Sequence, residues 1–312
     1  VFVYFGAVNY MAEVYLNGEK LGSHEGGFTP FNFEITGKLR PQDNFLIVKV
    51  DNKRRADGIP TVMTDWWNYG GITREVTLIE VPLTFIYDYF IQLSKGSTKN
   101  VSGWVKIDGA NKIQQVKIRI PEAGIDYVCT SNEQGVGNID LEVKDLKLWS
   151  PADPKLYTVL IFSETDTLHD QIGFRRIETK GPDILLNGHS VFLRGICLHE
   201  EAPLRGGRAW SEDDARIVLG WAKELNCNFI RLAHYPHNEH IIRLADRLGM
   251  MVWEEIPVYW TISWENNATL NLAKSQLNEI ISRDRNRAAV ILWSMANETP
   301  LSDARLKFLK EL

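Results

Sequence analysis

From about residue 179 onward, short apolar runs alternate with stretches of helical spacing, and this alternation constrains the fold more than any other feature. The apolar runs lie at residues 193–198, 229–232, 250–253 and 290–293. Between them, apolar residues recur every three or four positions, as in helices that cover one face of a sheet. Strand–helix repeats of this kind build parallel β-sheets. Because a (β/α)8 barrel needs eight strands and roughly 250 residues, we predict only the first half of such a TIM barrel over residues 179–312.

The ends of the predicted helices carry local signals. Ser211 is predicted to cap the first helix, with Asp214 at the capping-box position, and Gly249 is predicted to end the second. The first helix is expected to bury a face made of Ile217, Val218, Trp221, Ala222 and Leu225.

Residues 1–178 are typical of antiparallel β-structure. Short β-prone runs are separated by Gly, Asn and Pro, and no helical period competes with them. The Asn17-Gly18 pair predicts a two-residue hairpin turn, since both residues tolerate positive φ angles. We predict one sandwich over residues 1–82 and a second over residues 83–178, the latter of the size of an immunoglobulin-like domain.

Composition argues against several functions. A net charge of −5 speaks against a nucleic-acid-binding surface, which needs a basic stripe. No apolar run approaches the ~18 residues of a membrane-spanning helix, so no membrane partner is expected. Ten tryptophans among 312 residues suit a protein that stacks aromatic rings on a ligand such as a sugar. Three widely spaced cysteines form neither a metal-binding pattern nor a disulfide framework, so the cellular compartment stays open.

Polar side chains gather just past each predicted parallel strand, where (β/α) barrels place their chemistry. Carboxylates together with histidine, asparagine, arginine and tryptophan are the set that a glycosidase needs. Any single one of these residues is more often a helix cap or a solvated loop residue. Their convergence on one rim favours a barrel enzyme. In strand order they are His199, Glu200 and Glu201; Arg231, His234 and Tyr235; Glu254 and Glu255, with Trp260 and Trp264 beyond; and Asn297 and Glu298.

Six motifs in the same order resemble glycoside hydrolase family 2, the group of β-galactosidases, β-glucuronidases and β-mannosidases. The resemblance covers essentially the whole chain and implies a partial jelly-roll sandwich, an immunoglobulin-like β-sandwich and the first four βα units of a TIM barrel. The motifs lie at residues 14–31, 65–74, 148–157 with 173–175, 194–200, 231–236 and 293–298.

The resemblance also implies roles for individual residues. Glu298 would be the general acid/base of a retaining hydrolysis, and Asn297 would hold the 2-hydroxyl of the sugar. His199 and His234 would line the sugar subsite. Arg231 would lie beside the nucleophile.

Two carboxylates keep alternative interpretations. Asp65 matches a residue that reaches from the jelly roll into the active site, but it also reads as a turn residue before two aromatics. Glu255 could partner Glu298, although we interpret it as a substrate-binding or supporting group. Tyr259 and Thr261 stand where large β-galactosidases carry a magnesium-binding Glu-x-His. We therefore expect no such metal and no cofactor.

The family's nucleophilic Glu lies near the seventh barrel strand, whereas this chain stops soon after the fourth. We therefore expect the chain as written to be inactive and its complete parent to hydrolyse a carbohydrate substrate. The order of preference is β-galactoside, then β-glucuronide or β-mannoside, and a homo-oligomer stays open for the full-length protein. The alternatives are a non-catalytic carbohydrate-binding protein and an unrelated barrel enzyme such as an aldolase, which would want a lysine or phosphate-binding glycines near the strand ends.

Overall fold

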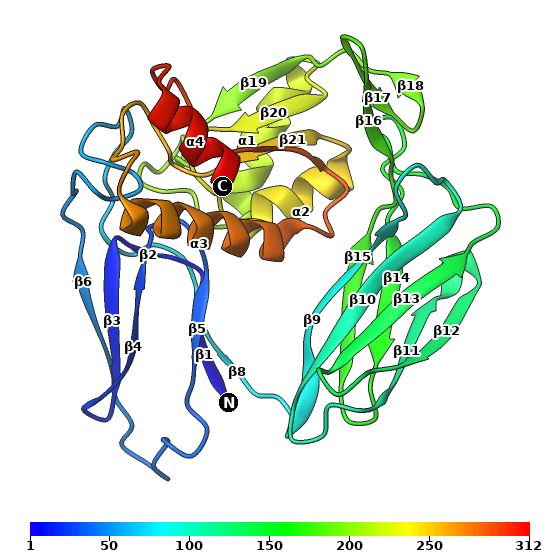
Figure 1. Ribbon diagram of the computed structural model, residues 1–312, viewed down its shortest axis with the longest axis horizontal. Helices are drawn as coiled ribbons and strands as arrows, with labels where there is room; N and C mark the ends of the chain where they lie inside the picture. Colours follow the sequence, from blue (N-terminus) through cyan, green and yellow to red (C-terminus); the bar gives the residue numbers. More distant parts are fainter.

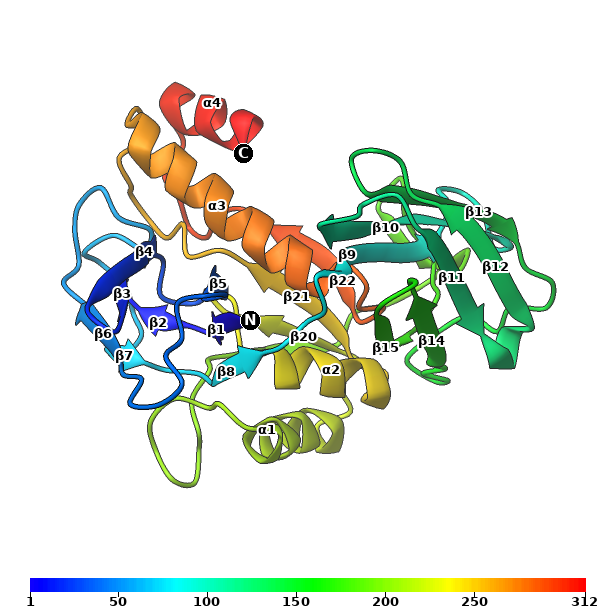
Figure 2. The same ribbon diagram turned by 90° about the horizontal axis from the view of Figure 1, so that it is seen from below.

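The computed structural model describes residues 1–312, which form two β-sandwiches on either side of a half-barrel (Figure 1; Figure 2). The first sandwich contains two three-stranded antiparallel sheets with strand orders β5-β1-β8 and β4-β3-β6, and a short β2-β7 pair. Its strands are β1 (Phe2–Phe5), β2 (Val8–Asn9), β3 (Met11–Leu16), β4 (Glu19–Glu25), β5 (Phe31–Glu34), β6 (Leu46–Asp51), β7 (Gly71–Ile72) and β8 (Val76–Ile79).

The predicted hairpin turn is confirmed. Leu16 pairs with Glu19, so Asn17 and Gly18 form a two-residue loop, with φ angles of 54° and 91°. Positive φ at both positions is the type I′ geometry that matches the twist of the flanking strands.

The second sandwich packs two antiparallel sheets, with orders β13-β10-β9 and β12-β11-β14-β15, over a core of aliphatic side chains. Its seven strands are those of an immunoglobulin-like sandwich. They are β9 (Thr84–Leu93), β10 (Asn100–Gly109), β11 (Gln115–Ile120), β12 (Ile125–Thr130), β13 (Val136–Glu142), β14 (Tyr157–Phe162) and β15 (Thr167–Ile172), with a 3-10 turn η1 (Pro121–Ala123) between β11 and β12.

A small sheet of β16 (Ile177–Lys180), β17 (Asp183–Leu186) and β18 (His189–Ser190) leads into the half-barrel. There the parallel strands run in the order β19-β20-β21-β22 and alternate with helices, as predicted. The four-stranded sheet does not close. Its elements are β19 (Gly195–Leu198), α1 (Glu212–Glu224), β20 (Phe229–Leu232), α2 (Glu239–Leu248), β21 (Met251–Glu255), α3 (Asn267–Asp284), β22 (Val290–Ser294) and α4 (Asp303–Glu311).

The predicted helix signals are confirmed, but the predicted buried face of α1 was partly wrong. Ser211 and Asp214 form a reciprocal capping box, and Gly249 ends α2 in the left-handed conformation. Trp221 and Leu225 are exposed, whereas α1 buries Ala215, Val218, Leu219 and Ala222. Both sets have helical spacing. The smaller residues are buried because α1 packs closely against α2 (Figure 2).

Helix α3 fixes the long loop that joins β6 to β7 of the first sandwich. Three side chains of α3 and its preceding loop donate hydrogen bonds to backbone oxygens of this loop: Ser263 to Ala56, Thr269 to Asp57 and Gln276 to Ile59, at 2.8–3.0 Å. In Figure 1, α3 accordingly runs across the end of the first sandwich. The loop contains Asp65, so its attachment positions that residue relative to the barrel strands.

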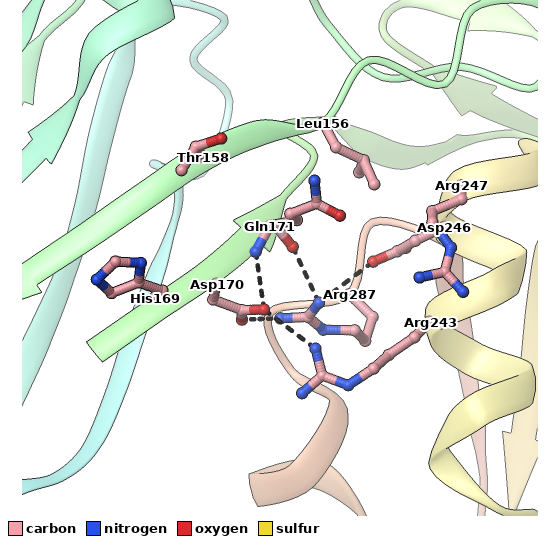
Figure 3. A pocket seen from close by; sticks show the side chains of 9 residues that line it. All are labelled: Leu156, Thr158, His169, Asp170, Gln171, Arg243, Asp246, Arg247 and Arg287. Carbon is pink, nitrogen blue, oxygen red and sulfur yellow. Dashed lines mark hydrogen bonds and ion pairs between the residues drawn. The ribbon is translucent and has the colours of Figure 1, made fainter. Parts of the chain in front are cut away.

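The second sandwich meets the half-barrel at a polar cavity of about 290 Å³. Figure 3 shows Asp170 of β15 paired with two cationic side chains, Arg243 of α2 and Arg287 of the loop before β22. Arg287 also donates to the carbonyl oxygen of Gln171 and lies 3.6 Å from Asp246. Burial raises the pKa of Asp246 to about 6, although Arg287 opposes the shift. The joint therefore combines these ion pairs with an apolar contact, since Trp149 of the second sandwich is buried within the core of the half-barrel.

No helix of the protein combines the length and the hydrophobicity that crossing a membrane requires.

Candidate active site

The rim at the carboxyl ends of β20 and β21 is organised by one ion pair. Arg231 lies within β20, and Glu255 is the last residue of the neighbouring strand β21. The guanidinium donates from Nε and Nη2 to the carboxylate of Glu255, at 2.8–3.0 Å. It also lies over the ring of Trp253, 4.3 Å from the centroid. Two-point contact and stacking are the geometry that arginine, unlike lysine, can satisfy.

Two further side chains join this pair. His234 Nδ1 lies 2.6 Å from an oxygen of Glu255, and Arg231 Nη2 donates to Oδ1 of Asn297 at 2.5 Å. Since Oδ1 is thereby occupied, the amide Nδ2 of Asn297 is the free group, and it is buried without a hydrogen-bond partner. The network thus presents an unused N–H donor beside the strand ends, which is costly unless a ligand accepts from it.

A second cluster brings the first sandwich to the barrel. One ligand atom each of Asp65, His199 and His234 lies within 4.8 Å of the others. Burial, followed by the neighbouring His234, lowers the pKa of His199. A neutral imidazole can both donate to and accept from a sugar hydroxyl. The same three groups are also the ones that could hold a metal ion, and the expectation of no metal stays a prediction.

Aromatic rings wall this cluster. Trp66, which follows Asp65, packs 5.1 Å from both Tyr235 and Tyr259 and 6.1 Å from His234. Partial burial, with the nearby Asp65 carboxylate next, raises the pKa of Tyr259 to about 12. Tyr259 therefore keeps its phenolic proton at neutral pH. Tyr235 was among the rim residues expected from the sequence, whereas Trp66 was missed, although it directly follows Asp65.

Glu298 lies at the same rim but outside the ion-pair network. It is exposed, has a φ angle of 50°, and accepts a hydrogen bond from Nε1 of Trp260 at 3.0 Å. Backbone hydrogen bonds join the two loops, from Asn297 N to Val258 O and from Trp260 N to Asn297 O, at 2.9 and 3.1 Å. The loop after β21 therefore holds the loop after β22.

Glu254 and Glu200 were predicted to lie at the rim, but both are buried against arginines, so the prediction is wrong for these two carboxylates. Glu254 and Glu255 lie within β21 rather than after it, so their side chains fall on opposite faces. Glu254 is buried against Arg283, and burial together with Asp284 raises its pKa well above the usual value. It is therefore not available at the rim.

Glu200 is likewise buried, between Arg74 of the first sandwich and Arg208. Burial alone would raise the pKa of Glu200, but the two guanidinium groups outweigh it and lower the pKa. Arg74 also donates to the backbone oxygens of Phe28 and Pro236. This cross-domain contact was missed, although Arg74 stands in a motif that the sequence analysis singled out.

The two sandwiches and the parallel α/β sheet, with a rim of carboxylates, histidines and aromatic rings, define a multidomain barrel protein of the glycoside hydrolase class. Three sequence models match in consecutive order: the sugar binding domain of glycosyl hydrolases family 2 at residues 1–82, glycosyl hydrolases family 2 at 84–175, and the family 2 TIM barrel domain at 177–311. The chain therefore belongs to glycoside hydrolase family 2.

Individual relatives agree with this assignment. A β-galactosidase of Thermoanaerobacterium thermosulfurigenes is 32% identical over all of this chain and 46% of its own length. A putative β-glucuronidase of Formosa agariphila is 31% identical over 95% of this chain and 37% of its own length. The structure of a Ruminococcus gnavus β-glucuronidase in complex with D-glucuronic acid superposes with a TM-score of 0.86 at 26% identity, covering 99% of this chain and 56% of that one. The chain thus spans about half the length of these relatives.

Proposed function

We propose that the complete gene product is a retaining β-glycosidase in which Glu298 is the general acid/base. One observation carries this proposal: Glu298 lies in the loop that follows β22, is exposed without a cationic partner and accepts a hydrogen bond from the indole of Trp260, whereas Glu200, Glu254 and Glu255 are all engaged by arginines. An acid/base must exchange its proton with the glycosidic oxygen and then with water, so it has to reach the open site.

Asn297 supports this proposal through its free donor. Arg231 holds Oδ1, so the buried Nδ2, which donates to no acceptor of the protein, is the group that can donate to a substrate oxygen. A contact to the 2-hydroxyl of the sugar strengthens as charge develops in the oxocarbenium-like transition state.

The cluster of Asp65, His199 and His234 is proposed to bind other hydroxyls of the same sugar. Each offers a polar atom within 4.8 Å of the other two, and Trp66 provides an apolar wall beside them. An apolar ring with a few convergent polar groups is the usual composition of a sugar subsite. The hydrogen bonds that α3 and its preceding loop donate to the loop of the first sandwich support this placement of Asp65 and Trp66.

Glu255 is proposed to support the site rather than to act as nucleophile. Its two oxygens are occupied by Arg231 and His234, and it is almost completely buried. A nucleophile must approach the anomeric carbon and lie ~5–5.5 Å from the acid/base. We infer that the nucleophile comes from a later strand of the barrel.

For the sugar, we favour a β-galactoside and place a β-glucuronide second. The carboxylate of Asp65 beside the two histidines suits neutral hydroxyls, while Arg231 is already neutralised by Glu255. A uronate carboxylate would need an unpaired cation, and Arg54, which lies over the ring of Trp66 without a carboxylate partner, is a candidate for that role. The likeness to β-glucuronidases in sequence and structure supports the second candidate.

The test is a panel of 4-nitrophenyl β-galactoside, β-glucuronide and β-mannoside, assayed with the complete gene product and its Glu298→Ala variant. We expect turnover of one glycoside, lost in the variant. Sugar binding without turnover of any glycoside would instead support a non-catalytic carbohydrate-binding protein.

A further inference from the structure

Three aromatic rings, those of Trp66, Tyr259 and Trp260, pack in a row from the first sandwich to Glu298. Trp66 packs against Tyr259 at 5.1 Å, edge to face, and Tyr259 is near-parallel to Trp260 at 6.0 Å and 15°. Trp66 and Tyr259 are buried, with 8% and 4% of their surface exposed, whereas Trp260 is 44% exposed. Trp260, the last ring of this row, therefore offers an apolar face that no other residue covers completely.

Trp260 is held in this position from two directions. Its backbone N–H donates to the carbonyl oxygen of Asn297, and its indole N–H donates to Oε2 of Glu298. Both Trp260 and Glu298 have left-handed backbone, with φ angles of 55° and 50°. Non-glycine residues adopt this conformation uncommonly, and here it occurs at both residues of the contact, one in each loop.

We propose that Trp260 is the platform on which the leaving group of the substrate stacks, an inference that rests on the proposed function. An acid/base contacts the glycosidic oxygen, the atom that joins the sugar to its leaving group. The ring of Trp260 is hydrogen-bonded to the carboxylate of this acid and is exposed to solvent, so it lies where the leaving group departs. The apolar face selects leaving groups with a flat apolar surface, which are an aryl ring or the C–H face of a second pyranose.

The indole N–H contributes separately from the ring. As the nucleophile inferred from a later strand bonds to the anomeric carbon, the bond from that carbon to the glycosidic oxygen breaks; its electron pair goes to the oxygen, which takes the proton of Glu298. The indole keeps its own hydrogen and donates it to the carboxylate left behind, a charge-assisted hydrogen bond. Trp260 thus both positions the acid and binds the leaving group.

Two variants of the complete gene product separate these contributions. Trp260→Gln keeps an N–H donor and removes the ring, whereas Trp260→Phe keeps a ring and removes the donor. Trp221→Gln, an equally exposed tryptophan on the outer face of α1, is the control. The substrates share one sugar and carry 4-nitrophenol, a second pyranose or fluoride; the fluoride has no face to stack and departs with little help from an acid.

We expect Trp260→Gln to lower kcat/KM roughly tenfold for the leaving group that stacks, and to change that of the fluoride by less than about twofold. Comparing the aryl glycoside with the disaccharide identifies which of the two ring types the platform takes. Trp260→Phe should retain KM for that substrate and lose kcat. Two results for Trp260→Gln would overturn the proposal: an equal loss of kcat/KM on the fluoride and on the ring-bearing substrates, or no loss of kcat/KM on either ring-bearing substrate. Absence of turnover of every substrate by the wild type would refute the proposed function instead.

Discussion

Nη2 of Arg231 donates hydrogen bonds to both carboxylate oxygens of Glu255 and also to Oδ1 of Asn297, and so sets the orientation of the Asn297 amide. Arg231 makes no hydrogen bond to Glu298, yet it thereby orients the side chain of Asn297, the residue immediately before Glu298. The ion pair is thus a supporting element of the proposed sugar subsite, and its loss should affect activity and stability differently.

Glu255→Gln should lower both stability and activity, because it leaves Arg231 partly buried beside a neutral group. Breaking such a pair from one side costs about 3 kcal/mol of the free energy of unfolding. In the double variant Arg231→Met/Glu255→Leu, stability should largely return, since an apolar pair carries no unpaired charge, while kcat stays low. Denaturant unfolding and steady-state kinetics on the complete gene product measure the two effects. Recovery of activity in the double variant would show that the pair does not orient Asn297.

Arg74→Met should weaken the attachment of the first sandwich to the half-barrel. The variant leaves Glu200 with one guanidinium instead of two in a fully buried site, and a loss of about 3 kcal/mol is expected. Glu75→Gln is the matched control, because its exposed pair with His240 contributes no more than about 1 kcal/mol. Thermal unfolding measures the stability, and limited proteolysis between residues 82 and 84 reports detachment. Equal effects of the two variants would contradict a special role for the buried cluster.

Asp246→Asn should stabilise the protein at neutral pH and have no effect near pH 4. The folded-state pKa of Asp246 is about 6, above its unfolded value, so ionisation opposes folding once the pH exceeds that unfolded value. The penalty grows as the pH rises from about 4 to 6 and is then constant, on the order of 1–3 kcal/mol. The asparagine carries no such penalty. Unfolding measured at pH 4, 5 and 7.5, with exposed Asp213→Asn as the control, tests this. A gain that is the same at all three pH values would contradict it.

The isolated 312-residue chain should self-associate and show no turnover. Strands β19 and β22 are unpaired edges of an open parallel sheet, and large apolar residues such as Phe192 and Leu301 are 78% and 85% exposed. Unprotected edges and apolar patches promote association. Light scattering of the chain beside the complete gene product measures this. A monomeric chain with Glu298-dependent turnover would contradict both expectations.

The strand and helix order of the half-barrel could be predicted because each element carries its own local pattern. The cap at Ser211 and the end of α2 at Gly249 are examples. The exposure of Trp221 could not be predicted, since two faces of α1 have equally apolar spacing and only the packing on α2 decides between them.

The candidate site was predictable as far as strand ends could be located. Side chains alternate between the two faces of β21, so the end of this strand decides which of Glu254 and Glu255 faces the rim. Both residues were predicted to follow the strand, and this error concealed that they lie on opposite faces. The pairing of Glu200 with Arg74 joins positions 126 residues apart. Nothing local indicates such a contact, and the same holds for the hydrogen bond between Trp260 and Glu298.

Chemical rescue of Glu298→Ala in the complete gene product tests the proposed acid/base most directly. With a poor leaving group, the variant should lose about 10²–10⁴-fold in kcat, and azide with an activated aryl glycoside should restore turnover and yield the β-glycosyl azide. Glu265→Ala, which removes an exposed carboxylate from the loop before α3, should behave as the wild type. Wild-type turnover by Glu298→Ala, or an equal loss in both variants, would contradict the assignment of Glu298.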